Sequence, residues 1–245
     1  MDISVASHAL QYAGILTEAA LLYYLVRNRD WGQWRGPGLY VLCLLAAGLT
    51  RALALHTWGL SSRQYFYVYW CTDVFLVLGA FLLVCSFFRC ACRSEQNMWR
   101  FARLLLAFVF VLVAGISVLV LARNLSALFP YFIYEFNQNL YFACLVLNTL
   151  LYFTLLQIES TDDRLGLLVC GVGIQFAGPA ATLALVHLTQ EAKHFALFLN
   201  SLVIPLCTLA MLLVWSYAIM RVPGKETKVA RRRGVEPVLA EVAAD

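Results

Sequence analysis

Long apolar runs separated by short polar breaks recur along the chain as far as residue 220. Each run has about 20 residues, the length of an α-helix that crosses the hydrocarbon core of a bilayer. The breaks are too short to fold as separate domains. The pattern predicts an all-α, polytopic bundle of seven transmembrane helices within one domain, residues 1–220. The predicted spans are 8–26, 38–58, 66–88, 101–122, 136–156, 165–188 and 195–220.

The composition agrees with a membrane protein. Of the 245 residues, 62% are hydrophobic and 13% are charged, and the mean hydropathy is +0.76. Soluble domains carry about 25% charged residues. The opening MDISVASHALQ has no Lys or Arg before the first apolar run, so it lacks the basic segment of a cleavable signal peptide. We therefore expect the first span to remain in the mature protein.

The distribution of positive charge predicts the orientation, because Lys and Arg are retained on the cytoplasmic side. Of the 18 Lys and Arg residues, 14 lie in alternate breaks and the final tail, whereas three, Arg63, Arg123 and Lys193, lie on the opposite side. This predicts a plasma membrane protein, in a bacterium the inner membrane, with its N-terminus outside and its C-terminus in the cytoplasm.

The tail, residues 221–245, is polar and basic in its first half, and we expect it to be disordered. Its three consecutive arginines, 231–233, indicate contact with anionic lipid at the cytoplasmic face rather than a nucleic-acid site. The predicted partners are therefore the lipid bilayer and anionic lipid. The sequence does not indicate a protein partner.

Two halves of the chain are similar when one is shifted by about 130 residues. QYAGILTEAALLYYLV then aligns with LYFACLVLNTLLYFTL, and FLLVCSF aligns with MLLVWSY. The alignment predicts two parallel repeats of three helices with the fourth helix as a connector, a plan found in transporters. The alternative is a chance match, because Leu, Val, Phe and Ala are so common here.

Three charged residues lie within the first three predicted spans: Glu18, Arg51 and Asp73. Counted inward from the outer helix ends, each lies about 10 to 15 Å deep. An isolated charge near a helix centre costs about 2.5 to 3.5 kcal/mol, so we expect the three to form one buried ionic cluster. The guanidinium of Arg51 can bind two carboxylates through its planar fork. The cluster would be either a structural clamp or a proton or cation site, in which one carboxyl holds a proton.

Uncharged polar residues gather in the second half. The fifth span opens with Glu135, Asn137, Gln138 and Asn139. Later spans place Gln175, Thr182, Asn200 and Ser201 within apolar sequence. Such residues indicate either close packing between helices or the lining of a hydrated cavity.

The four histidines, His8, His56, His187 and His194, fall at the predicted outer helix ends. Three imidazoles near Asp73 would suit zinc, but no pair has a tight ligand spacing on one helix. These histidines are therefore weak metal candidates, and we expect no cofactor, with zinc as the alternative. Alkaline-ceramidase and adiponectin-receptor-like hydrolases are similar in being seven-span zinc proteins. The paired histidines of their last helix have no counterpart in KHFALFLNSLVIP.

Several functional classes are not indicated, because the sequence lacks the residues or motifs that they require. No lysine lies within a predicted span, which excludes a retinal Schiff base there. The chain contains no P-loop, no H-E-x-x-H and no G-x-S-x-G, so nucleotide hydrolysis, zincin proteolysis and elbow-type serine hydrolysis are not indicated. We assign no catalytic residue.

The aromatic segment YFYVYW, residues 65–70, together with the seven-span pattern resembles a group of uncharacterised bacterial seven-span integral membrane proteins. The predicted plan also resembles sugar-facilitating SWEET proteins, whose Pro-Gln signature is missing. We expect a non-enzymatic small-ligand sensor or membrane scaffold. The alternatives are a small-solute or proton-coupled transporter and an intramembrane metal-dependent hydrolase.

Overall fold

The structure is a computed structural model, and it describes residues 3–27, 35–59, 62–92, 96–123, 128–157, 163–188 and 193–221. Inside the helices, the side chains within residues 3–8, 96–97, 120–135 and 182–201 lie outside this description. The described residues form seven α-helices. These are α1 (Ile3–Arg27), α2 (Arg35–Trp58), α3 (Arg63–Ala91), α4 (Gln96–Arg123), α5 (Leu128–Gln157), α6 (Asp163–Leu188) and α7 (Lys193–Arg221).

The all-helical prediction is confirmed, and all seven helices are long and apolar enough to cross a membrane. Each predicted span falls inside one helix. The helices extend beyond the apolar runs, most of all at the start of α5, because the backbone continues its hydrogen bonding into the polar and aromatic flanks. Residues 222–245, almost all of the predicted tail, lie outside the described residues.

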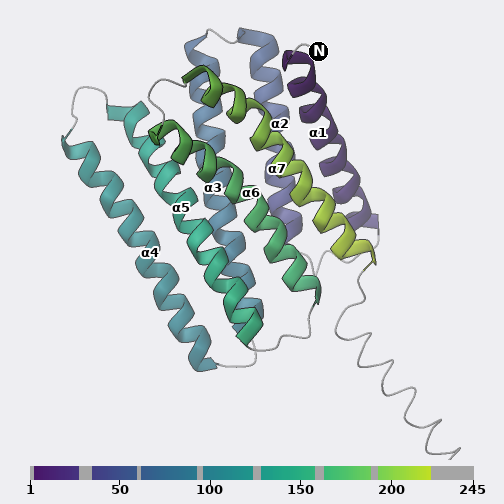
Figure 1. The fold of residues 1–245 in the computed structure, drawn as a ribbon, viewed down its shortest axis with the longest axis vertical. Coiled ribbons are helices and arrows are strands. Elements are labelled where there is room, and N and C mark those ends of the chain that lie inside the picture. The colour runs from purple at the N-terminus through teal and green to yellow at the C-terminus, as the bar shows by residue number, and fades with distance from the viewer. Residues whose placement is uncertain are drawn as a thin grey trace, which may run out of the picture.

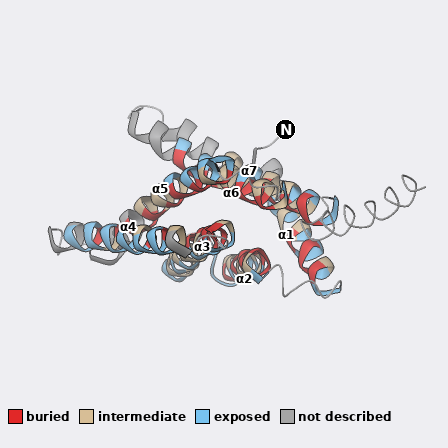
Figure 2. Cartoon of the chain, turned by 90° about the horizontal axis from the view of Figure 1, so that it is seen from below, coloured by how far each residue is buried: buried red, intermediate tan, exposed pale blue. Residues whose placement is uncertain are grey.

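Six of the helices pack in a closed order around the bundle. Each helix packs against the next in the order α1, α2, α3, α5, α6 and α7, and α7 packs against α1. The most extensive contact is between α6 and α7. The fourth helix is peripheral: α4 packs on α5 and touches α3 only slightly. Figures 1 and 2 show α4 at one end of the bundle and α1 towards the other.

α2 and α3 pack side by side, and the residues that end α2 and begin α3 are well defined. Gly59 ends α2 in the left-handed region, with φ of 73°, and its backbone N–H donates to the carbonyl of Leu55 at 3.0 Å. Glycine adopts this conformation without the steric cost of a Cβ atom. Ser62 then caps α3, because its Oγ accepts a hydrogen bond from the backbone N–H of Tyr65 at 3.0 Å.

The tightest packing joins α6 to α7. A Cβ atom added at Gly171 would lie 2.8 Å from the indole of Trp215, so only glycine fits against that ring. The indole Nε1 donates to the carbonyl of Leu168 at 3.0 Å, and Trp215 is fully buried. At Gly178, an added Cβ would lie 2.7 Å from Sγ of Cys207. These glycines allow close approach of two helices, as small residues commonly do in membranes.

Candidate functional site

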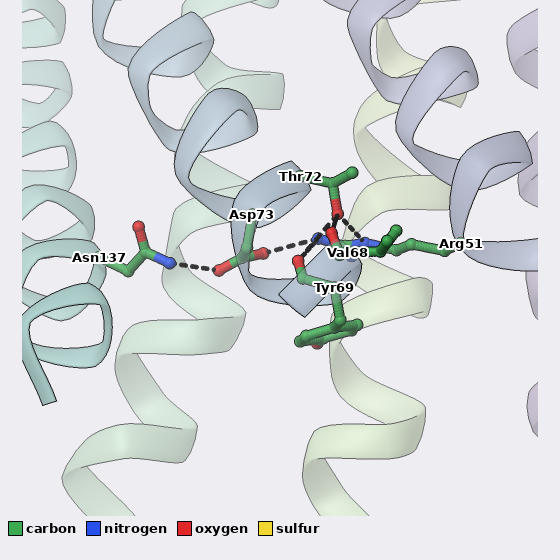
Figure 3. A network of polar contacts seen from close by, with 6 residues as sticks. All are labelled: Arg51, Val68, Tyr69, Thr72, Asp73 and Asn137. Atoms are coloured by element: carbon green, nitrogen blue, oxygen red, sulfur yellow. Dashed lines mark hydrogen bonds and ion pairs between the residues drawn. The ribbon is translucent and has the colours of Figure 1, made fainter. Parts of the chain in front are cut away.

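A polar face of α3 lies against α2. Tyr69, Thr72 and Asp73 share this face because residues three and four positions apart are neighbours on a helix. Arg51 extends from α2 towards them, and Figure 3 shows its guanidinium directed at Asp73 and Thr72. Nη2 of Arg51 lies 3.1 Å from Oδ1 of Asp73, which makes an ion pair between the two helices.

Further contacts fix the guanidinium in this position. Nε of Arg51 donates to Oγ1 of Thr72 at 2.8 Å, and Nη2 also donates to the backbone carbonyl of Tyr69 at 3.3 Å. The guanidinium carbon lies 4.2 Å from the centre of the Tyr69 ring, within the range of a cation–π interaction. The hydroxyl of Thr72 in turn donates to its own helix, at the carbonyls of Val68 and Tyr69. The arginine is thus held by charge, hydrogen bonds and an aromatic ring.

A third helix joins the network through Asn137 of α5. Its Nδ2 donates to Oδ2 of Asp73 at 2.9 Å, so both oxygens of the carboxylate have a partner (Figure 3). Asn137 is only 3% exposed. We call Arg51, Tyr69, Thr72, Asp73 and Asn137 the α2–α3–α5 network. It connects three helices that are far apart in sequence through one carboxylate.

The network keeps unused hydrogen-bonding capacity. The side chains of Arg51 and Asp73 are 19% and 18% exposed, so the ion pair is not sealed. Among the described residues, Nη1 of Arg51 has no hydrogen-bond partner. Oδ1 of Asn137 is buried and also has none. One unused donor group and one unused acceptor therefore belong to the same network, and buried polar atoms normally find a partner.

Glu18, the third residue of the predicted ionic cluster, lies elsewhere. It is 6% exposed, and its buried Oε2 has no hydrogen-bond partner among the described residues. The separation follows from how α1 and α2 pack. Ile15 is the nearest residue to a Cβ placed on Gly48, so in this antiparallel pair Arg51 lies further towards the C-terminal end of α2, and Glu18 lies in the opposite direction. Glu18 is then offset from Arg51 by about 9 Å along the helix axis, at 1.5 Å per residue.

Two further amide side chains, Asn148 of α5 and Gln175 of α6, carry buried atoms without a hydrogen-bond partner among the described residues. Asn137 and Asn148 share a face of α5, and Nδ2 of Asn148 donates to the carbonyl of Val169 in α6 at 3.1 Å. Oδ1 of Asn148 and Oε1 of Gln175 have no hydrogen-bond partner within the described part of the chain. Gln175, a predicted cavity residue, thus carries an unused acceptor in α6. We call Asn137, Asn148 and Gln175 the amide column.

The remaining predicted site residues fall largely outside the described side chains. This holds for the cavity candidates Thr182, Asn200 and Ser201 and for the metal candidates His8, His187 and His194. His56 is described and is exposed at the end of α2. Within the described residues, no group of three His, Cys, Asp or Glu side chains could hold a metal ion.

Sequence reasoning missed part of the α2–α3–α5 network. The pairing of Arg51 with Asp73 follows from two opposite charges in neighbouring spans, and the spacing of Tyr69, Thr72 and Asp73 signals a shared helix face. Asn137 carried no comparable signal. It is one of several polar residues at the start of α5, and only the rotation of that helix selects it.

Compared with models of known protein families, with curated proteins and with solved structures, the chain matches none of them. The site is therefore interpreted from its own geometry.

Proposed function

We propose that this protein is a non-enzymatic membrane sensor that binds a small polar ligand at the α2–α3–α5 network. The observation that carries the proposal is the partly exposed ion pair of Arg51 and Asp73. It joins α2 to α3, is hydrogen-bonded to Asn137 of α5, and retains an unused donor at Nη1. A purely structural clamp would gain most from full burial and from a partner for every polar atom.

The unused atoms define the chemistry of the ligand. Nη1 of Arg51 would donate to a carboxylate, phosphate or hydroxyl oxygen of the ligand. Oδ1 of Asn137 would accept a hydrogen bond from a ligand N–H or O–H group. A small molecule that carries both an acceptor and a donor group, such as an amino acid or a hydroxy acid, satisfies both. The ring of Tyr69 beneath the guanidinium would form one wall of the site.

Ligand binding here would change how the helices pack. Asp73 receives hydrogen bonds from α2 and α5 at its two oxygens, so a ligand that replaces either partner alters the contact of α3 with that helix. A ligand shifts a conformational equilibrium by as much as its affinities for the two states differ. The basic cytoplasmic face, where we propose contact with anionic lipid, is where such a change would reach a partner or the membrane.

The test is ligand-dependent stabilisation of the purified protein in lipid nanodiscs. We would screen the common amino acids and small hydroxy acids for an increase in the thermal unfolding midpoint. The expected result is an increase for wild type and for Arg63→Ala, an exposed arginine at the start of α3, and loss of the increase in Asp73→Asn and Arg51→Lys. Equal stabilisation of all four proteins, or of none, contradicts the proposal.

A second candidate function is small-solute or proton-coupled transport, and the amide column favours it. Asn137 and Asn148 are 11 residues apart on one face of α5, which corresponds to about 16 Å along the helix. Buried polar groups in such a row often line a pathway. The peripheral position of α4 supports the proposed plan of two three-helix repeats with a connector. Uptake of the stabilising ligand into proteoliposomes, reduced in Gln175→Leu, is the expected result for a transporter.

The proposed orientation has its own test. With the C-terminus in the cytoplasm, a C-terminal green fluorescent protein folds and fluoresces in bacterial cells. A fusion protein that is present at full length but does not fluoresce contradicts the orientation.

The proposed contact with anionic lipid is tested separately. Replacement of the three arginines at 231–233 by glutamine should reduce the preference of the reconstituted protein for anionic lipid.

A further inference from the structure

Glu18 is a buried carboxyl group in the middle of α1 that the α2–α3–α5 network does not use. The residue is 6% exposed, and Oε2 is buried without a hydrogen-bond partner among the described residues. Arg51 forms its ion pair with Asp73, and Glu18 has no part in it. The carboxyl group is therefore isolated as well as buried.

Its own helix surrounds it with apolar side chains. Leu21, Leu22 and Leu25 follow on the same side of α1 and are 1%, 9% and 0% exposed. Glu18 therefore belongs to the buried face of the helix and is directed at the bundle, not at the lipid. α1 packs against α2 and α7, so these two helices are the possible sources of a neutralising charge.

Neither helix offers such a charge among its described side chains. On α2, the groups that can ionise at comparable depth are Tyr40, Cys43 and Arg51. The ring of Tyr40 lies against Trp215 of α7, and Arg51 is bound to Asp73 of α3. On α7, the corresponding groups are Cys207, which lies against Gly178 of α6, Tyr217, which is 58% exposed, and Arg221 at the end of the helix. Within the described part of the chain, Glu18 therefore has neither an ion pair nor a hydrogen bond to its buried Oε2.

The energetics of burial then decide the protonation state. An ionised carboxylate buried without a partner costs several kcal/mol, and such a group in practice takes up a proton instead. A neutral carboxylic acid loses only the hydrogen bonds that it made to water, which is a much smaller cost. The arrangement of α1 against α2 and α7 is therefore compatible with the neutral acid and not with the carboxylate.

We propose that Glu18 is a proton-binding site, in which a proton from solvent is held on the carboxyl group while α1 is packed against α2 and α7. Release of that proton leaves a carboxylate inside an apolar interface, which weakens the packing of α1. The ligand of this site is thus the proton, and the responding element is the first helix. The inference does not depend on the proposed ligand site, because Glu18 does not contact the α2–α3–α5 network.

Infrared spectroscopy of the full chain in nanodiscs tests the protonation state directly. A protonated carboxyl absorbs at a higher frequency than the two carboxylate bands, and its band shifts in heavy water. The wild-type spectrum at neutral pH should contain this acid band, and the Glu18→Gln spectrum should lack it. Asp163→Asn, which removes an exposed carboxyl at the start of α6, should retain the band. An acid band of equal size in wild type and Glu18→Gln overturns the proposal, as does its absence from wild type.

The pH dependence of unfolding tests the coupling to α1. The folded protein holds a proton on Glu18 that the unfolded chain releases at neutral pH, so the stability of wild type should fall as the pH rises. Glu18→Gln removes this linkage, and its unfolding midpoint should fall less over the same range, while Asp163→Asn should follow wild type. If Glu18→Gln does not fold, Glu18→Met takes its place in the infrared measurement and in the measurement of unfolding against pH. A Glu18 variant with the wild-type pH dependence contradicts the coupling of the proton to packing.

Discussion

Two polar regions of the bundle differ in how their polar groups are satisfied. In the α2–α3–α5 network, most of the contacts across helices join two side chains, and the central ion pair is partly exposed. Between α5, α6 and α7, Asn148 and Trp215 donate instead to the backbone carbonyls of Val169 and Leu168, which are adjacent in α6. The second region is closed around buried rings and glycines.

This difference separates a site that can exchange partners from one that fixes packing. A side-chain partner can rotate away to admit a ligand, whereas a backbone carbonyl of a helix cannot move without the helix. The α2–α3–α5 network is therefore suited to binding, and the α5–α6–α7 contact to fixing the register of those helices. Substitutions in the two regions should have different consequences for ligand response and stability.

The largest effect is expected from Arg51→Ala. It leaves Asp73 without its counter-charge. Because the ion pair is partly exposed, we expect a cost of about 3 kcal/mol, at the low end of the range for breaking a buried pair. The folded yield and the unfolding midpoint in mixed detergent micelles should both fall. Arg63→Ala is the matched control, because Arg63 is exposed and contacts only Tyr67 of its own helix among the interactions seen. Equal folded yields for the two variants would show that the ion pair does not stabilise the protein.

A smaller loss is expected from Gly171→Ala in the packing region. The added methyl group would lie 2.8 Å from the rigid indole of Trp215, and overpacking of this kind costs about 2 kcal/mol. Gly166→Ala, in the same helix, meets no atom within 4 Å and should be neutral or slightly stabilising. Measurement of both unfolding midpoints checks this prediction. A Gly171→Ala protein as stable as Gly166→Ala would show that the helices are not in such close contact.

Asn137→Ala should have an intermediate effect on stability and a specific effect on ligand response. It removes a hydrogen bond to the carboxylate of Asp73, worth about 1.5 kcal/mol for a charged acceptor. Any stabilisation by ligand should decrease as well, because the variant also loses the acceptor Oδ1. Gly171→Ala should retain the ligand response despite its lower stability. The ratio of ligand-induced shifts in the two variants thus distinguishes binding from packing.

The smallest effect is expected from Trp215→Phe. The ring is largely retained, but the hydrogen bond from Nε1 to the Leu168 carbonyl is lost, which costs about 1 kcal/mol. Trp58→Phe is the control, because Trp58 is 48% exposed at the end of α2. Comparison of the two unfolding midpoints measures the contribution of the buried hydrogen bond. Ligand response should be unchanged in both variants.

The sequence by itself determined the seven helices and their approximate ends. In a bilayer an unpaired backbone group is costly, so an apolar run of sufficient length must form a helix regardless of its neighbours. Every predicted span accordingly lies within one observed helix. The pairing of Arg51 with Asp73 was also accessible, because the few charges in neighbouring spans have few possible partners.

The tertiary structure alone decided which polar groups share a site. Counting residues from the helix ends placed Glu18 at the level of Arg51. The actual register opposes Ile15 to Gly48, and Oε2 of Glu18 has no hydrogen-bond partner in the part of the chain that the structure describes. The rotation of α5 chose Asn137 as the second partner of Asp73. Register and rotation result from the packing of side chains such as Trp215 on Gly171, and hydropathy contains no information about them.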